Sequence, residues 1–118
     1  MKRIQKIQHN GRDIVRFDFQ GLTEDDEIIS YIKEIEDYLL ALESPTLQLN
    51  NITGVYFTPQ VMNELTAAGK RWEHTVLKDA IVGVVGVKRI LLRAYNAIVG
   101  GKAKAFSTEE EALEWLAG

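Results

Sequence analysis

The sequence predicts an α/β protein with a mixed, mainly parallel five-stranded sheet and about four helices. Extended and helical hydrophobic patterns alternate along most of the chain, which is typical of strands joined by helical crossovers. Asn10-Gly11 lies between two extended segments and indicates one antiparallel hairpin. Residues 80–85 form a nearly unbroken apolar run, typical of a strand covered on both faces. The predicted order is β-β-α-β-α-β-α-β-α.

Length and composition limit the classes of protein that fit. The chain has 118 residues, of which 46% are hydrophobic and 2 are proline, so we expect a single domain over 1–118 with a substantial core. It has no cysteine, which excludes disulfides and thiolate metal sites. A net charge of −3 argues against general nucleic-acid binding. The charged start MKRIQK leads into no apolar segment, so we expect no secretory signal, no membrane span and a cytoplasmic location.

The first half of the chain contains a hairpin and a long helix. The hairpin strands are expected at 3–8 and 12–19, and the second strand alternates apolar and polar positions. A helix is expected over 24–43, because isoleucines and leucines recur there at three- and four-residue steps. Thr23 is the expected N-cap, since four acidic residues follow it and favour a helix N-terminus.

The next segments form a strand and a second helix. Ser44-Pro45 ends the first helix, and a strand follows over Thr46–Asn50. Thr58-Pro59 is a helix start signal, with a hydroxyl cap and proline at the first helical position. The expected buried stripe of this helix consists of Val61, Leu65, Ala68 and Trp72.

The last third begins with the strand at 80–85, followed by a turn at Gly86 and a helix that Gly100-Gly101 ends. A short strand over 102–106 comes next. Ser107 with Glu110 has the spacing of a capping box for the final helix. The expected buried stripe of the helix after Gly86 consists of Val87, Ile90, Leu91, Ala94 and Ile98.

Three stretches carry a family resemblance: LNNITGVYFTPQVM at 49–62, AIVGVVGVKRILLRAYN at 80–96 and FSTEEEALEWL at 106–116. With the element order, they resemble the SpoIIAA-like family, a branch of the STAS superfamily, over nearly the whole chain. These motifs are signatures of a fold and not of catalysis. The resemblance implies a small sheet with helices packed around it. It also implies a role as a protein-interaction switch, although many single-domain relatives have no assigned role.

Switch-type relatives carry an AspSerSerGly-like turn whose serine is phosphorylated, and the corresponding residues here are PheThrProGln at 57–60. Thr58 is the one hydroxyl in this turn. We interpret it as a helix cap, although a phosphate on it would also lie at a helix N-terminus. The departure argues against the kinase-switch mechanism.

Two ligand sites are candidates. The turn at Gly86 enters a helix beside Lys88 and Arg89, which is compatible with an anion contact, although it matches no known phosphate-loop pattern. The family tie to lipid-transfer-like sheets also allows an apolar pocket between the sheet and the second and third helices, with Trp72 and Tyr95 in its wall. Neither possibility names a particular molecule.

The sequence nominates no reaction, cofactor or metal. His9 and His74 lack a nucleophile or a second ligand at a suitable spacing. We therefore expect a non-catalytic protein-interaction or regulatory module, with a protein partner or weak self-association supported by an acidic first helix and by basic residues between 88 and 104. The alternative is a carrier or sensor of a small apolar or anionic ligand. An enclosed apolar pocket favours the carrier, and an exposed apolar patch favours the interaction module.

Overall fold

The computed structural model describes residues 2–118, so Met1 of the charged start lies outside the described residues. The structure confirms the predicted element order and sheet. The five strands pair in chain order, with β1 and β2 antiparallel and all later pairs parallel. Their bounds are β1 Ile4–His9, β2 Arg12–Asp18, β3 Thr46–Asn51, β4 Val76–Val82 and β5 Ala103–Phe106.

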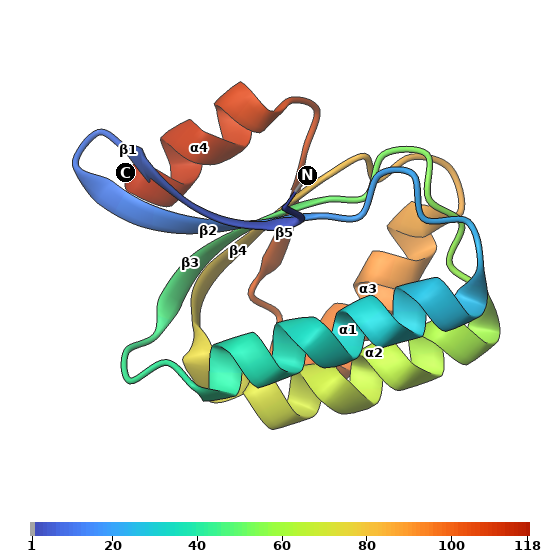
Figure 1. The fold of residues 1–118 in the computed structure, drawn as a ribbon. Helices are drawn as coiled ribbons and strands as arrows, with labels where there is room; N and C mark the ends of the chain where they lie inside the picture. Colours follow the sequence, from blue (N-terminus) through green and yellow to red (C-terminus); the bar gives the residue numbers. More distant parts are fainter. Residues whose placement is uncertain (1) are drawn as a thin grey trace.

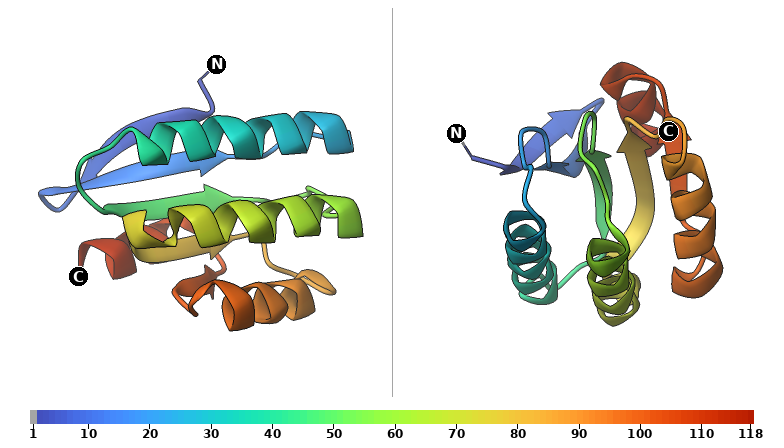
Figure 2. Two further views of the ribbon diagram at one scale, coloured as in Figure 1. Left: turned by 90° about the horizontal axis from the view of Figure 1, so that it is seen from below. Right: turned by 90° about the vertical axis from the view of Figure 1, so that its right-hand side faces the viewer.

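Three helices cover one face of the sheet and one covers the other (Figures 1 and 2). Right-handed crossovers between strands that advance in one direction place all their helices on the same side, which explains the row formed by α1, α2 and α3. The last helix follows the final strand and is free to pack on the opposite face. The bounds are α1 Asp25–Leu40, α2 Pro59–Trp72, α3 Lys88–Val99 and α4 Glu109–Ala117, with a short 3₁₀ helix, η1, at Glu73–Thr75.

The sheet separates two hydrophobic cores. The larger core lies under α1 and α2, and β2 contributes Val15 and Phe17 to it. The smaller core lies under α4 and includes Ile14 of β2, so the predicted alternation of this strand is confirmed. Strand β2 therefore has one face for each core.

Two predicted caps are one residue too early. The N-cap of α1 is Glu24, not Thr23, and the backbone N–H of Glu24 donates to Glu27 Oε1 at 3.2 Å. The N-cap of α4 is Thr108, whose Oγ1 accepts from Glu111 N–H at 3.2 Å. In both places consecutive residues compete for the role, and the direction in which the chain enters the helix decides between them.

The strand predicted at 80–85 is displaced, because β4 begins at Val76 and ends at Val82. Gly83 has a φ of +99°, and a side chain there would approach Thr53 N to 2.6 Å. This turn ends the strand and carries Val85 into solvent, where it is 64% exposed. The apolar run was thus a poor guide to the end of the strand.

The predicted buried face of α3 is wrong at four of its five positions, whereas Leu91 is partly buried and packs against the larger core. Val87, Ile90 and Ile98 are between 53% and 62% exposed, and Ala94 is exposed as well. The buried residues are instead Tyr95 and Val99. Apolar residues stand next to one another in this helix, so the helical period fits two faces that differ by about 100°. The helical period alone therefore does not identify the buried face, which is set by packing against the rest of the protein.

Candidate ligand-binding pocket

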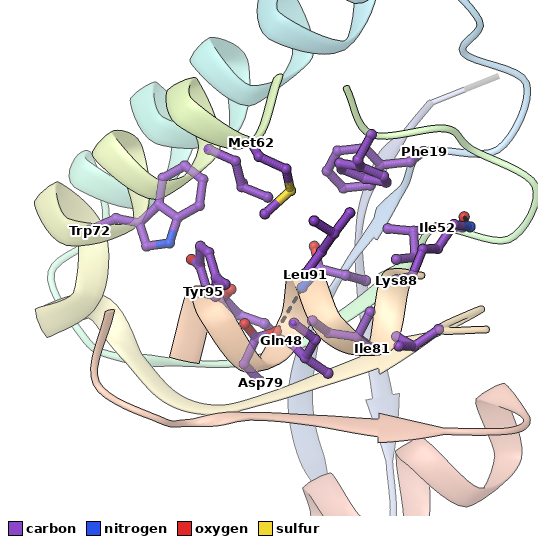
Figure 3. A pocket seen from close by; sticks show the side chains of 15 residues that line it. Phe19, Gln48, Ile52, Met62, Trp72, Asp79, Ile81, Lys88, Leu91 and Tyr95 are labelled. Carbon is purple, nitrogen blue, oxygen red and sulfur yellow. Dashed lines mark hydrogen bonds between the residues drawn. The ribbon is translucent and has the colours of Figure 1, made fainter. Parts of the chain in front are cut away.

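A pocket of about 80 Å³ lies between the sheet, α2 and α3 (Figure 3). One ordered water needs on the order of 10–15 Å³ of such space, so the pocket accommodates a small organic group. Its walls are mostly apolar side chains, which come from the sheet, from α2 and α3, and from the loops that follow the strands. They include Phe19, Phe57, Met62, Leu65, Trp72, Ile81, Leu91, Leu92 and Tyr95.

The floor of the pocket is polar, although it belongs to the middle of the sheet. Gln48 and Asn50 point from β3, and Asp79 points from β4. Gln48 is 2% exposed and Asp79 is 9% exposed. Asn50 Nδ2 donates to Asp79 Oδ1 at 2.7 Å, and Gln48 Nε2 donates to Thr46 Oγ1 at 2.8 Å. Each amide thus uses one N–H within the sheet, and its side-chain carbonyl oxygen is left as an acceptor.

Burial raises the pKa of Asp79 to about 7, and the hydrogen bond from Asn50 opposes this rise. A buried carboxylate without a cation beside it is costly, because the interior of a protein solvates charge poorly. The pocket therefore contains a carboxyl group that changes its charge near neutral pH.

Lys88 lines the same pocket from the first turn of α3. Its Nζ donates to the backbone carbonyls of Ile52 at 2.9 Å and Gly83 at 3.3 Å. Burial lowers the pKa of Lys88. The side chain thereby ties the start of α3 to the ends of β3 and β4, and part of its hydrogen-bonding capacity is used by the protein.

Close packing of Tyr95 on α2 bounds the pocket on one side. The Tyr95 ring lies against Gly69, where an added Cβ would be 2.9 Å from Tyr95 Cζ. Gly69 is buried within α2 and has an ordinary helical backbone. The absence of a side chain at Gly69 is therefore what allows the ring to pack so closely against α2.

The residues predicted to contact a ligand fall into three separate places. The structure brings Trp72, Lys88 and Tyr95 together in the pocket. Arg89 is exposed and lines a different, open depression that also includes Gly83 and Arg93. Gly86 is exposed in the turn before α3. The first amides of α3 donate to turn carbonyls, as in Arg89 N–H to Gly86 O at 3.1 Å, so they are already paired.

Thr58 lies away from the pocket lining and caps α2. Its Oγ1 accepts from Val61 N–H at 3.2 Å and donates to Asp25 Oδ2 at 2.8 Å. A phosphate on this oxygen would lose the donated hydrogen bond and place negative charge beside a carboxylate. The geometry favours the cap over the phosphate acceptor.

Sequence reasoning missed the three polar floor residues. The signal was present in Thr46–Asn51, where leucines alternate with Gln48 and Asn50 in a strand expected to lie inside the sheet. A helix-covered sheet face is normally apolar, so polar side chains at those positions indicate a site. Asp79 directly precedes the apolar run at 80–85 and carried no signal of its own.

The described residues hold no group of three or more His, Asp or Glu side chains that would suit a metal ion. Within 2–118, no helix is both long and apolar enough to cross a membrane. His9 Nε2 lies 2.8 Å from Glu114 Oε1 between the hairpin and α4, and neither residue lines the pocket. His74 is exposed on η1.

Comparison with known proteins identifies the fold. No family model matches the chain, and no curated protein matches it. It is similar to the crystal structure of an uncharacterized DUF3478-family protein with a SpoIIAA-like fold from Shewanella loihica PV-4. The TM-score is 0.73 at 21% sequence identity, over 96% of this chain and 91% of that chain. The chain therefore has the SpoIIAA-like α/β fold that its sequence motifs predicted.

Proposed function

We propose that this protein is a carrier or sensor of a small, largely apolar molecule and has no catalytic chemistry of its own. The observation that carries the proposal is the pocket between the sheet, α2 and α3. Ligand sites are typically concave, mostly apolar and equipped with a few polar groups that orient the ligand. The aromatic and aliphatic walls and the polar floor correspond to that description.

The proposal is tested by identifying what the protein retains. The protein is purified gently from its own cells, extracted under denaturing conditions, and the extract is analysed by mass spectrometry. We expect a small molecule in stoichiometric amount. Met62→Trp fills the pocket from α2 and should abolish retention. The matched control is Asn63→Trp, which adds the same side chain at the exposed neighbouring position.

Equal retention by both variants would place the bound molecule elsewhere. The carrier proposal would be overturned if the extract contained no small molecule and if benzylamine, benzyl alcohol and benzoate all failed to bind to the purified protein.

A second candidate is an interaction module that pairs with a second copy of this chain through the outer face of α3. Val85 and Val87 just before α3, and Ile90 and Ile98 on it, expose between 53% and 64% of their surface. Arg89 and Arg93 lie exposed on the same helix, and α1 presents an acidic first turn that a second copy offers as a counter-charge. The wider basic cluster expected between 88 and 104 does not support this pairing, because the Nζ atoms of Lys88 and Lys102 donate to backbone carbonyls of the same chain.

Sedimentation velocity over a range of protein and salt concentrations tests this candidate. Self-association should disappear in Ile90→Glu and persist in Leu40→Glu, which changes an exposed apolar residue on α1. A wild-type monomer at every concentration would remove the candidate, and so would a dimer that Ile90→Glu leaves intact.

A further inference from the structure

We infer that the pocket selects a small apolar molecule that ends in an amine, whose ammonium group binds to Asp79 with the side-chain oxygens of Gln48 and Asn50. The inference rests on the proposed carrier function and names the chemical class of the ligand. It follows from the kind of hydrogen-bonding capacity that the pocket floor still offers.

The floor offers acceptors. The Nδ2 of Asn50 already donates to Asp79, and the Nε2 of Gln48 already donates to Thr46. Each amide therefore has its carbonyl oxygen left as an acceptor, and the second carboxyl oxygen of Asp79 adds another. Among the described residues, every side-chain N or O atom that is completely buried has a hydrogen-bond partner. Acceptors left unpaired here are therefore not completely buried, and all three residues line the pocket.

An ammonium group satisfies this set better than a hydroxyl group or a carboxylate does. It has three donors and no acceptor, and it supplies the positive charge that a buried carboxylate lacks. A hydroxyl group offers one donor and no charge. A carboxylate ligand would bring further acceptors and a repulsive charge to Asp79.

The surrounding charges do not supply this cation. Lys88 and Tyr95 of α3 line the same pocket, but Lys88 Nζ donates to the carbonyls of Ile52 and Gly83. On the far side of Tyr95, Glu73 of η1 and Lys102 line a smaller cavity that Asp79 also borders. Lys102 Nζ donates to Val76 O at 2.9 Å. The apolar walls next to the floor are suited to an aromatic or aliphatic body.

Three probes of the same shape test the inference: benzylamine, benzyl alcohol and benzoate. Their binding is measured by titration with NMR detection of backbone amides in β4 and α3. At about pH 8 we expect benzylamine to bind about tenfold more tightly than benzyl alcohol, and benzoate to bind most weakly.

Asp79→Asn keeps the shape of the side chain and removes its charge. We expect it to abolish the preference for the amine and to leave the affinity for benzyl alcohol within about twofold. Asp37→Asn removes one charge at an exposed position on α1 and should behave like the wild type. Should Asp79→Asn fail to fold, the wild type still tests the inference. Its preference for the amine should shrink between about pH 8 and about pH 5.5, where Asp79 takes up a proton.

The outcomes separate the inference from the proposed function. If benzyl alcohol binds as tightly as benzylamine, or benzoate binds more tightly than both, the pocket is a ligand site but does not select amines. A preference for the amine that survives in Asp79→Asn also overturns the inference. If no probe shifts the NMR signal of any backbone amide around the pocket, the inference fails, and the pocket no longer supports the carrier proposal.

Discussion

Asp79 lies on a central strand, where protein surrounds the carboxyl group and its charge is costly. Its neighbours in the strand pair, Gln48 and Asn50, are amides, which hydrogen-bond a carboxyl group without neutralising it. An interior position of this kind reduces the stability of the ligand-free protein, and a site for a cationic ligand gives a reason for its presence.

The raised pKa of Asp79 predicts how stability depends on pH. The folded protein retains a proton to about pH 7, while the unfolded chain loses it near the ordinary pKa of about 3.9. Between these values the folded state binds more protons, so the free energy of unfolding falls as pH rises, by up to roughly 1.4 kcal/mol per pH unit. Above the folded pKa the penalty is complete and constant.

Asp79→Asn removes this penalty, so its stability advantage over the wild type should grow from about pH 4 to about pH 7 and then level off. Urea unfolding at a series of pH values measures the difference. Asp37→Asn on the surface is the control and should show no such trend. An advantage that is constant over the whole range would contradict the assignment.

At the scale of elements, Thr58 couples two helices. It caps α2 and, through the same oxygen, donates to Asp25 in the first turn of α1. The pair joins the N-termini of the two helices that cover the larger core. A second link joins them further along, where Arg71 Nη2 donates to Glu36 Oε1 at 3.1 Å.

Thr58→Ala should lower the free energy of unfolding by about 1–2 kcal/mol, because the helix cap and the partly buried hydrogen bond to the Asp25 carboxylate are lost together. Thr58→Ser keeps the hydroxyl and should lose much less. Thr23→Ala is the matched control, since Thr23 is exposed and Glu24 caps α1 instead. Equal losses in Thr58→Ala and Thr23→Ala, measured by chemical denaturation, would show that the cap at Thr58 contributes nothing.

At the scale of the whole molecule, the sheet separates the smaller core under α4 from the face that holds the larger core and the pocket. The face under α4 packs Leu49, Ala80 and Leu116 into a core without access to the pocket. Arg16 on β2 fastens the first turn of α4 through Glu109, with Nη2 to Oε2 at 2.7 Å. The opposite face carries the pocket between the strands and two helices.

Leu116→Ala should therefore cost about 2–5 kcal/mol of stability, as expected for a fully buried leucine, and leave probe affinity unchanged. Leu65→Ala removes a half-buried leucine from the pocket wall and should change probe affinity at a smaller cost in stability. Denaturation and the NMR titration are measured on both variants. A change in probe affinity in folded Leu116→Ala would show that the two faces are coupled.

Local signals in the sequence were enough to predict the order of the elements, the hairpin at Asn10-Gly11 and the cap at Thr58, because turn residues, caps and hydrophobic period act locally. A family resemblance pointed to Trp72 and Tyr95 as residues of a pocket wall, and the glycine turn before the helix pointed to Lys88 as an anion contact. Only the tertiary structure decided which face of α3 is buried, since neighbouring apolar residues satisfy the same period twice. It alone placed Gln48, Asn50 and Asp79 on one floor, because residues on adjacent parallel strands meet only through a register that is set by packing.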